Sequence, residues 1–180
     1  MAAAALRVEP ALVAESTVMI RRLAATLLAA ALLAGSAPLT AQLRAPKAEL
    51  TPTTEAASVR RGRTAKLLLK VVLPAQIHIQ SNKPRDEAFF PTALVLTPPA
   101  GVTVSGTAYP AAVDFVQEGQ ATPLAVFEKT FTVTATVAIA ASVAPGELTV
   151  PGRFDYQACD DKVCYRPVKT DVTWTLSVIP

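Results

Sequence analysis

The clearest pattern in the chain is an alternation of apolar and small polar residues. Residues 131–139 place Phe, Val, Ala, Val and Ile at every second position, mostly with Thr between them, and residues 172–178 repeat this order with Val, Trp, Leu and Val. A period of two is typical of a strand that buries one face. Shorter segments that we also expect to be strands are residues 64–73, 76–80, 92–97, 102–108 and 148–158.

Proline and glycine divide most of these segments, as at Pro98-Pro99-Ala100-Gly101 and Pro145-Gly146. No helical spacing of apolar residues runs through residues 42–180. Short strands at this density predict an all-β fold, an immunoglobulin-like antiparallel β-sandwich. We expect one domain over residues 52–180, preceded by a polar, proline-bearing lead-in at residues 42–51.

The first 41 residues differ from the rest. An Ala/Leu run from Leu23 to Ala34 follows two arginines and leads to a stretch of small residues that ends at Ala41. This order is typical of a secretory signal peptide, so we expect cleavage near Ala41 and a periplasmic or secreted mature chain without a membrane span. A membrane anchor is the alternative, but the run is shorter than the roughly 20 residues of a spanning helix. Met19 shortly precedes the arginines, and a start there gives a signal peptide of ordinary length.

Composition and motifs exclude several classes of protein. The chain has 180 residues, 51% of them apolar, which suffices for a core. A net charge of +3 is too small to indicate nucleic-acid binding. One histidine and two cysteines do not make a four-ligand zinc site without carboxylates, and both methionines precede residue 42, which excludes a Met-rich copper carrier. The common nucleotide, metalloprotease and hydrolase motifs are lacking, so we expect neither a metal nor a cofactor.

The candidate chemistry lies in two cysteines. Cys159 and Cys164 enclose Asp160-Asp161-Lys162, a sequence typical of a turn. We expect the pair to flank a hairpin turn, where two thiols come within bonding distance, and export favours a disulfide. If the strand that carries Phe154 and Tyr156 continues through this segment, Cys159 faces away from the aromatic side.

The spacing leaves open whether this disulfide is structural or redox-active. Closing a loop of about six residues stabilises a fold by only about 2 kcal/mol, against nearly 5 for about a hundred residues. The bond therefore suits reversible opening, although structural disulfides that close a turn exist. Asp160 and Asp161 disfavour a neighbouring thiolate, and Lys162 offsets this in part. These charges favour a relay over a strongly activated nucleophile.

Residues 111–123 interrupt the strand pattern and place Phe115 beside Asp114. The residues alone leave two interpretations open. One is a surface loop whose phenylalanine packs down, and the other is a lid over a site.

The run FDYQACDDKVCYRP resembles the active-site segment of the N-terminal periplasmic domain of the thiol:disulfide interchange protein DsbD. The run IHIQSNKPRDEAFFPTALVL and the passage from Val104 to Phe131 are similar to that domain as well, so the resemblance covers residues 52–180. It implies an immunoglobulin-like fold in which a cysteine pair passes electrons to thioredoxin-like or disulfide-isomerase-like periplasmic proteins, including those of cytochrome c biogenesis. The membrane and thioredoxin domains of DsbD have no counterpart in these residues, so we expect a separate membrane electron donor.

The resemblance assigns roles to four residues by position. Cys164 matches the cysteine that forms the mixed disulfide with partners, and Cys159 matches the cysteine that resolves it. Asp114 and Phe115 match a cap whose aromatic ring shields the disulfide, with Phe127 as an alternative ring. Four residues separate the cysteines here, where some DsbD proteins have five, so the turn geometry is expected to differ.

Three further residues are candidates for the wall of the site. His78 falls in a strand that passes near the redox site in the family, although a lone histidine between two isoleucines is more often structural. Tyr156 and Tyr165 either wall the site or pack as ordinary core and surface residues.

The sequence thus favours a thiol–disulfide relay through Cys159 and Cys164. The first alternative is a secreted immunoglobulin-like binding module in which the disulfide is structural, so that Cys-to-Ser changes alter only stability. The second is a metal-handling protein that uses the two thiols with His78 or Asp160, for which two thiols without Met or further His make a weak site.

Overall fold

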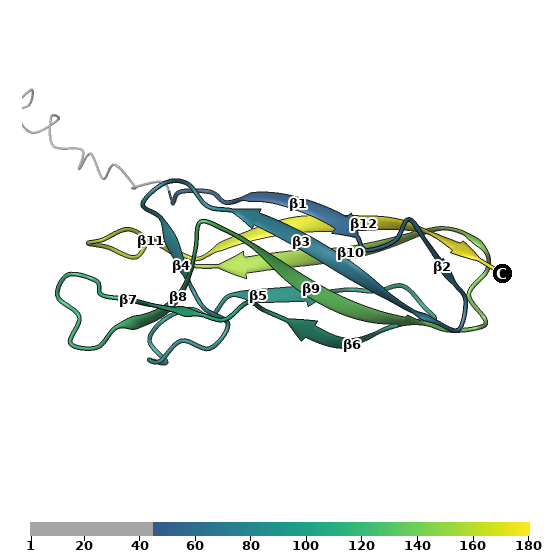
Figure 1. Ribbon diagram of the computed structural model, residues 1–180, viewed down its shortest axis with the longest axis horizontal. Coiled ribbons are helices and arrows are strands. Elements are labelled where there is room, and N and C mark those ends of the chain that lie inside the picture. The colour runs from purple at the N-terminus through teal and green to yellow at the C-terminus, as the bar shows by residue number, and fades with distance from the viewer. Residues whose placement is uncertain (1–44) are drawn as a thin grey trace, which may run out of the picture. The chain divides into compact units, whose positions relative to one another are not determined.

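The computed structural model describes residues 45–180, and within this range the chain forms strands and no helix (Figure 1). The strands are β1 (Glu49–Thr54), β2 (Ser58–Arg60), β3 (Thr64–Val72), β4 (His78–Gln80), β5 (Ala93–Leu96), β6 (Val102–Ala108), β7 (Val113–Phe115), β8 (Leu124–Glu128), β9 (Thr130–Ile139), β10 (Gly146–Tyr156), β11 (Ala158–Cys159) and β12 (Val168–Ile179). The expected signal peptide, with a start at Met19 and cleavage near Ala41, lies outside the described residues.

Two four-stranded sheets form a β-sandwich. The first has the strand order β1-β3-β9-β6 and the second the order β2-β12-β10-β5. Strand pairs are antiparallel except that of β2 with β12, which is parallel. The prediction of an immunoglobulin-like β-sandwich is therefore confirmed.

The core follows the alternation seen in the sequence. From Val133 in β9 and from Val172 in β12, every second residue is buried, and these side chains belong to one hydrophobic cluster. Trp174 of β12 is 1% exposed, and its Nε1 donates a hydrogen bond of 2.9 Å to the Leu68 carbonyl of β3. The indole thus fills the space between the two sheets and links them through a polar contact.

A third, smaller sheet with the order β11-β4-β8-β7 lies at one end of the sandwich, away from the C-terminus (Figure 1). It continues the first sheet, since β4 follows β3 and only Lys129 separates β8 from β9. Lys129 has a φ of 56°, a left-handed conformation that turns the chain between these two strands. All three residues of β4 are buried, including the polar His78 and Gln80.

Several strand boundaries differ from those expected. β1 begins at Glu49, inside the expected lead-in, and tolerates Pro52 because it is an edge strand. β8 was not predicted because residues 124–127 are all buried and show no alternation. The short β2 and β7 were not predicted either. The strand expected from residue 76 begins only at His78, because Gln76 has a φ of 64° in the preceding turn.

Candidate functional site

Cys159 and Cys164 form a disulfide, with their Cα atoms 4.0 Å apart. The two residues pair as an isolated antiparallel bridge, and residues 160–163 form the turn between them. Asp160 Oδ1 accepts hydrogen bonds from the amides of Lys162 and Val163, at 2.9 and 2.8 Å, which is the way an Asp side chain holds a turn. The predicted disulfide across a turn is confirmed.

The strand through Phe154 and Tyr156 does not continue to the cysteines. β10 ends at Tyr156, and Gln157 shifts the chain so that Ala158 and Cys159 pair with β4 of the third sheet. The Gln157 side chain secures this shift by accepting the Phe90 amide at 3.0 Å and donating to the Tyr165 carbonyl at 3.1 Å. We expected Cys159 to face away from the aromatic side only if the strand continued through this segment. Because the strand ends at Tyr156, that expectation does not apply.

The two cysteines differ in exposure. Cys159 is 0% exposed, whereas Cys164 is half-buried. Each sulfur has an amide side chain beside it: Gln80 Nε2 lies 3.8 Å from Cys159 Sγ, and Gln117 Oε1 lies 3.9 Å from Cys164 Sγ. Both glutamines are buried. One cysteine of the pair is therefore enclosed by the protein, and the other is partly exposed.

Tyr165 lies at the site and is bonded to the cysteine turn. Its hydroxyl donates to Asp160 Oδ2 at 2.7 Å. Hydrogen bonds from the Val163 amide, the Tyr165 hydroxyl and the Lys162 amide lower the pKa of Asp160, and the bond to Asp160 raises the pKa of Tyr165. Asp160 thus holds a negative charge next to the disulfide at neutral pH.

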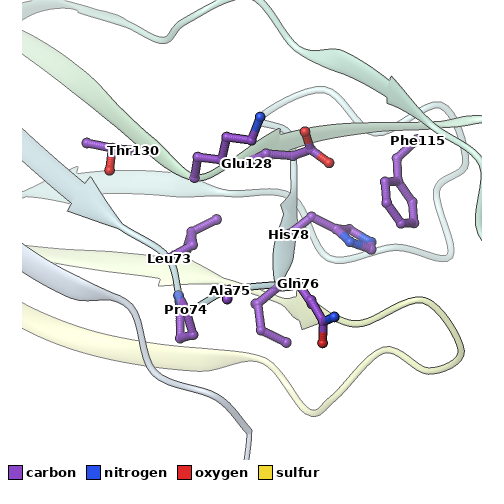
Figure 2. Close-up of a pocket in the computed structure, with 10 residues that line it drawn as sticks. Leu73, Pro74, Ala75, Gln76, His78, Phe115, Glu128 and Thr130 are labelled. Carbon is purple, nitrogen blue, oxygen red and sulfur yellow. The ribbon is translucent and has the colours of Figure 1, made fainter.

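His78 lies directly opposite Cys159 in the pairing of β4 with β11. It is 1% exposed, and its ring packs against that of Phe115 with the centroids 3.9 Å apart. Figure 2 shows both side chains. Burial lowers the pKa of His78, and the charges of Glu128 and Asp160 oppose that shift. The imidazole is therefore neutral at neutral pH.

Phe115 and Asp114 belong to β7, at the edge of the third sheet. Phe115 is half-buried over His78, while the exposed Asp114 forms an ion pair with Arg85. The loop that follows β7 reaches the cysteine turn, since the Glu118 amide donates to the Asp161 carbonyl at 3.2 Å. The segment is therefore partly a strand and partly a loop that contacts the cysteine turn.

A cavity of about 410 Å³ lies beside the rings of His78 and Phe115, which are tilted by 35° relative to each other (Figure 2). Other residues that line it are Leu73, Pro74, Gln76 and Glu128. The cavity adds accessible surface next to the ring pair.

Two of the candidate aromatic residues lie in the core. Tyr156 is 1% exposed, packs against Phe154 and accepts a hydrogen bond of 2.9 Å from the Ala48 amide. Phe127 is 2% exposed and packs against Phe131. Of the two phenylalanines considered as a cap, Phe115 is the one that contacts His78, the residue paired with Cys159.

The sequence reading missed Gln80 and Gln117. Gln80 stands two residues after His78 in a strand, so the alternation of side chains places both on one face. That signal was present in the run HIQ, whereas nothing in the sequence singles out Gln117. Within residues 45–180, no three His, Cys, Asp or Glu side chains are grouped as a metal site requires, and no helix could cross a membrane.

Comparison with known proteins identifies a family for this chain. The family model described as "Thiol:disulfide interchange protein DsbD, N-terminal" matches residues 47–175. Among solved structures, the N-terminal periplasmic domain of ScsB from Proteus mirabilis is 17% identical with a TM-score of 0.48, and the match covers 78% of this chain. The chain spans about half of that structure, 48% of its length.

A second similar structure is BslA, described as a bacterial hydrophobin, with 14% identity and a TM-score of 0.37 over 76% of this chain and 98% of that one. No curated protein sequence compared with the chain matches it. The family model covers most of the described residues, including both cysteines. The chain therefore belongs to the family of the N-terminal domain of the thiol:disulfide interchange protein DsbD.

Proposed function

We propose that this protein is a periplasmic thiol–disulfide relay that passes reducing equivalents to partner oxidoreductases through Cys159 and Cys164. The observation that carries the proposal is the unequal burial of the two cysteines. Cys159 is 0% exposed and Cys164 is half-buried, so a partner sulfur reaches Cys164 first. Such an arrangement suits one cysteine for the mixed disulfide and the other for its resolution.

The exchange balances without a cofactor. In the reduced protein the Cys164 thiolate attacks one sulfur of a partner disulfide, the partner's S–S bond breaks, and its second sulfur leaves as a thiolate. The Cys159 thiolate then attacks Cys164 Sγ. This step forms the intramolecular disulfide and releases the first partner sulfur as a thiolate. Two electrons have then passed to the partner, and the relay is oxidised.

We infer that β7 and the following loop act as the cap of this site. Three contacts support that role: Phe115 packs on His78, Gln117 Oε1 lies 3.9 Å from Cys164 Sγ, and the Glu118 amide binds the turn at Asp161. A docking partner has to displace the segment around Gln117 to reach Cys164. The cap thereby restricts exchange to proteins that bind this end of the sandwich.

The partners we propose are thioredoxin-like or disulfide-isomerase-like periplasmic proteins, with a membrane protein as electron donor. Val116 and Val163 are exposed, at 78% and 44%, and they adjoin the cap and Cys164 in the sequence. Exposed apolar residues at these positions favour a protein partner over a small charged thiol. The cytochrome c biogenesis proteins named by the resemblance are candidates within this class.

The reduction potential of the cysteine pair tests the proposal. The purified protein is equilibrated in thiol buffers of defined potential, and the oxidised fraction is measured by mass spectrometry after alkylation. A value between about −180 and −270 mV supports exchange. A value below about −300 mV means a bond that resists reduction. That result would replace the relay with the alternative of a binding module that has a structural disulfide.

Trapping identifies the attacking cysteine. With a thioredoxin-like protein in its oxidised form as the partner, Cys159→Ser is expected to accumulate a mixed disulfide through Cys164. Cys164→Ser serves as the matched control and is expected to accumulate much less, because Cys159 is enclosed. Equal trapping by the two variants contradicts the assigned order.

A further inference from the structure

Two buried side chains beside the disulfide leave polar atoms without partners. Among residues 45–180, His78 Nε2 and Gln80 Oε1 are the buried side-chain atoms that lack a hydrogen bond. Both residues lie in β4 and are 1% and 0% exposed. Buried polar groups are normally paired, so each exception calls for a reason.

Both residues face Cys159. Gln80 Nε2 lies 3.8 Å from Cys159 Sγ, and His78 is the direct cross-strand partner of Cys159. Directly opposed residues of an antiparallel pair project to the same face, with Cβ atoms about 4.5–5.5 Å apart. Phe115 covers the His78 ring on another side. The unpaired imidazole nitrogen thus belongs to the buried residue that lies directly opposite the resolving cysteine.

The redox state of Cys159 decides whether this nitrogen has a donor. In the disulfide the sulfur carries no proton, so it offers His78 no hydrogen bond. After reduction, and in the mixed disulfide, Cys159 is a thiol with a proton to donate. Cys159 has to lose that proton in order to attack, and a buried thiol ionises reluctantly because burial disfavours the charged form.

We propose that His78 is the proton acceptor for Cys159 in the step that resolves the mixed disulfide, a role that rests on the proposed function. The proton moves from Cys159 Sγ to His78 Nε2 as Sγ attacks Cys164 Sγ. The Cys159–Cys164 bond forms, and the partner sulfur leaves with the electron pair of its bond as a thiolate. The proton then passes from His78 to that thiolate or to water. Gln80 Nε2 donates to Cys159 Sγ while the sulfur is negative.

The charged groups around His78 suit this exchange. Glu128 faces it from β8 and Asp160 from the cysteine turn, Lys129 lines the same cavity, and Phe115 on β7 carries no charge. Burial lowers the pKa of His78 more than the two carboxylates raise it, so the ring starts neutral and can accept a proton. Glu128 and Asp160 then stabilise the imidazolium that forms.

A single-turnover reaction with 5,5′-dithiobis(2-nitrobenzoate) separates the two steps. Attack by Cys164 releases one coloured thionitrobenzoate, and resolution by Cys159 releases a second. In His78→Gln we expect the first release to stay within about twofold of the wild-type rate, and the second to slow by about tenfold or more at neutral pH. The slowed step should rise with pH in proportion to hydroxide, whereas the wild-type step should level off above the His78 pKa.

The outcomes separate this role from the function on which it rests. If the wild type releases both equivalents and His78→Gln resolves at the same rate with the same pH profile, His78 is not the acceptor. If the wild type retains the mixed disulfide and releases no second equivalent, the relay itself is overturned, and the role of His78 with it. Thr130→Ala is a matched control, since Thr130 lines the same cavity and offers no base.

A measurement on the wild-type protein tests the proposal even if the His78→Gln variant does not fold. The chain has one histidine, so in untagged protein the imidazole nitrogen signals belong to His78. Reduction should shift the Nε2 resonance because the Cys159 thiol becomes a hydrogen-bond donor to it. In Cys159→Ala the same reducing treatment should leave the resonance in place. An Nε2 signal that is unchanged by reduction of the wild type contradicts the proposal.

Discussion

The Tyr165 hydroxyl donates its hydrogen bond to Asp160 across the turn that the disulfide closes, at 2.7 Å. The same carboxylate accepts two backbone amides of the turn through its other oxygen. One acidic side chain therefore both shapes the turn and places a negative charge next to the disulfide.

We expect Asp160→Asn to make the reduced protein more reactive. The asparagine oxygen retains the bonds to the turn amides, but the negative charge next to Cys164 is lost, so the thiolate is favoured. Alkylation of Cys164 by iodoacetamide at neutral pH should become faster by roughly two- to tenfold. Asp171→Asn, on the exposed side of β12, is the control and should leave the rate unchanged. A slower reaction in Asp160→Asn would contradict this account.

The pH dependence of stability should change in the same variant. Hydrogen bonds hold the pKa of Asp160 below its ordinary value of 3.8, so the ionised form stabilises the fold above that pH. This contribution is lost as the pH falls through the lower, folded-state pKa. Urea unfolding of wild type and Asp160→Asn from pH 7 to pH 2 measures it. The advantage of the wild type should shrink at the acid end, and a difference that stays constant over the whole range would count against the shift.

Phe115→Ala should open the site without unfolding the protein. Removing the ring uncovers His78 and loosens the segment that places Gln117 beside Cys164. Reduction of the disulfide by a bulky thiol should become severalfold faster, while reduction by a small thiol changes less. Val116→Ala is the matched control, because Val116 is the next residue of the segment and is 78% exposed. Equal reduction rates in the two variants would show that Phe115 does not act as part of the cap.

Trp174→Phe should weaken the fold and spare the site. The substitution removes the bond from Nε1 to the Leu68 carbonyl and leaves that partly buried acceptor without this donor. The expected loss is about 1–3 kcal/mol in the free energy of unfolding, measured with urea. The reduction potential of the cysteine pair should stay at the wild-type value, because Trp174 lies between the large sheets. A shifted potential would show that the sandwich and the redox site are coupled.

The sandwich was predictable from sequence because its strands bury one face. Alternation in β9 and β12 identified both strands and the side of each that enters the core. The same reasoning failed for β8, whose residues 124–127 are buried on both faces, and for β1, where proline concealed an edge strand. Alternation of apolar and polar residues identifies a strand that is buried on one face. It gives no signal for a strand that is buried on both faces or on neither.

The site was only partly predictable. The spacing of the cysteines and the turn residues between them are local, and they specified the disulfide. The pairing of His78 with Cys159 depends on the break at Gln157, which moves the chain from one sheet to another. No local pattern encodes that shift, because it is secured by bonds to Phe90 and Tyr165, one of them 67 residues away along the chain.

This contrast between local and distant contacts has a consequence for how the protein matures. The cysteines are five positions apart, so a newly made chain can oxidise them before any sheet exists. The enclosure of Cys159 has to wait for β4, which is 79 positions from it at Gln80. A short peptide with this turn can therefore serve as the reference for the reduction potential of the cysteine pair without the surrounding fold. By linkage, any difference between its reduction potential and that of the folded protein, converted to a free energy for two electrons, equals the difference in folding stability between the oxidised and reduced forms.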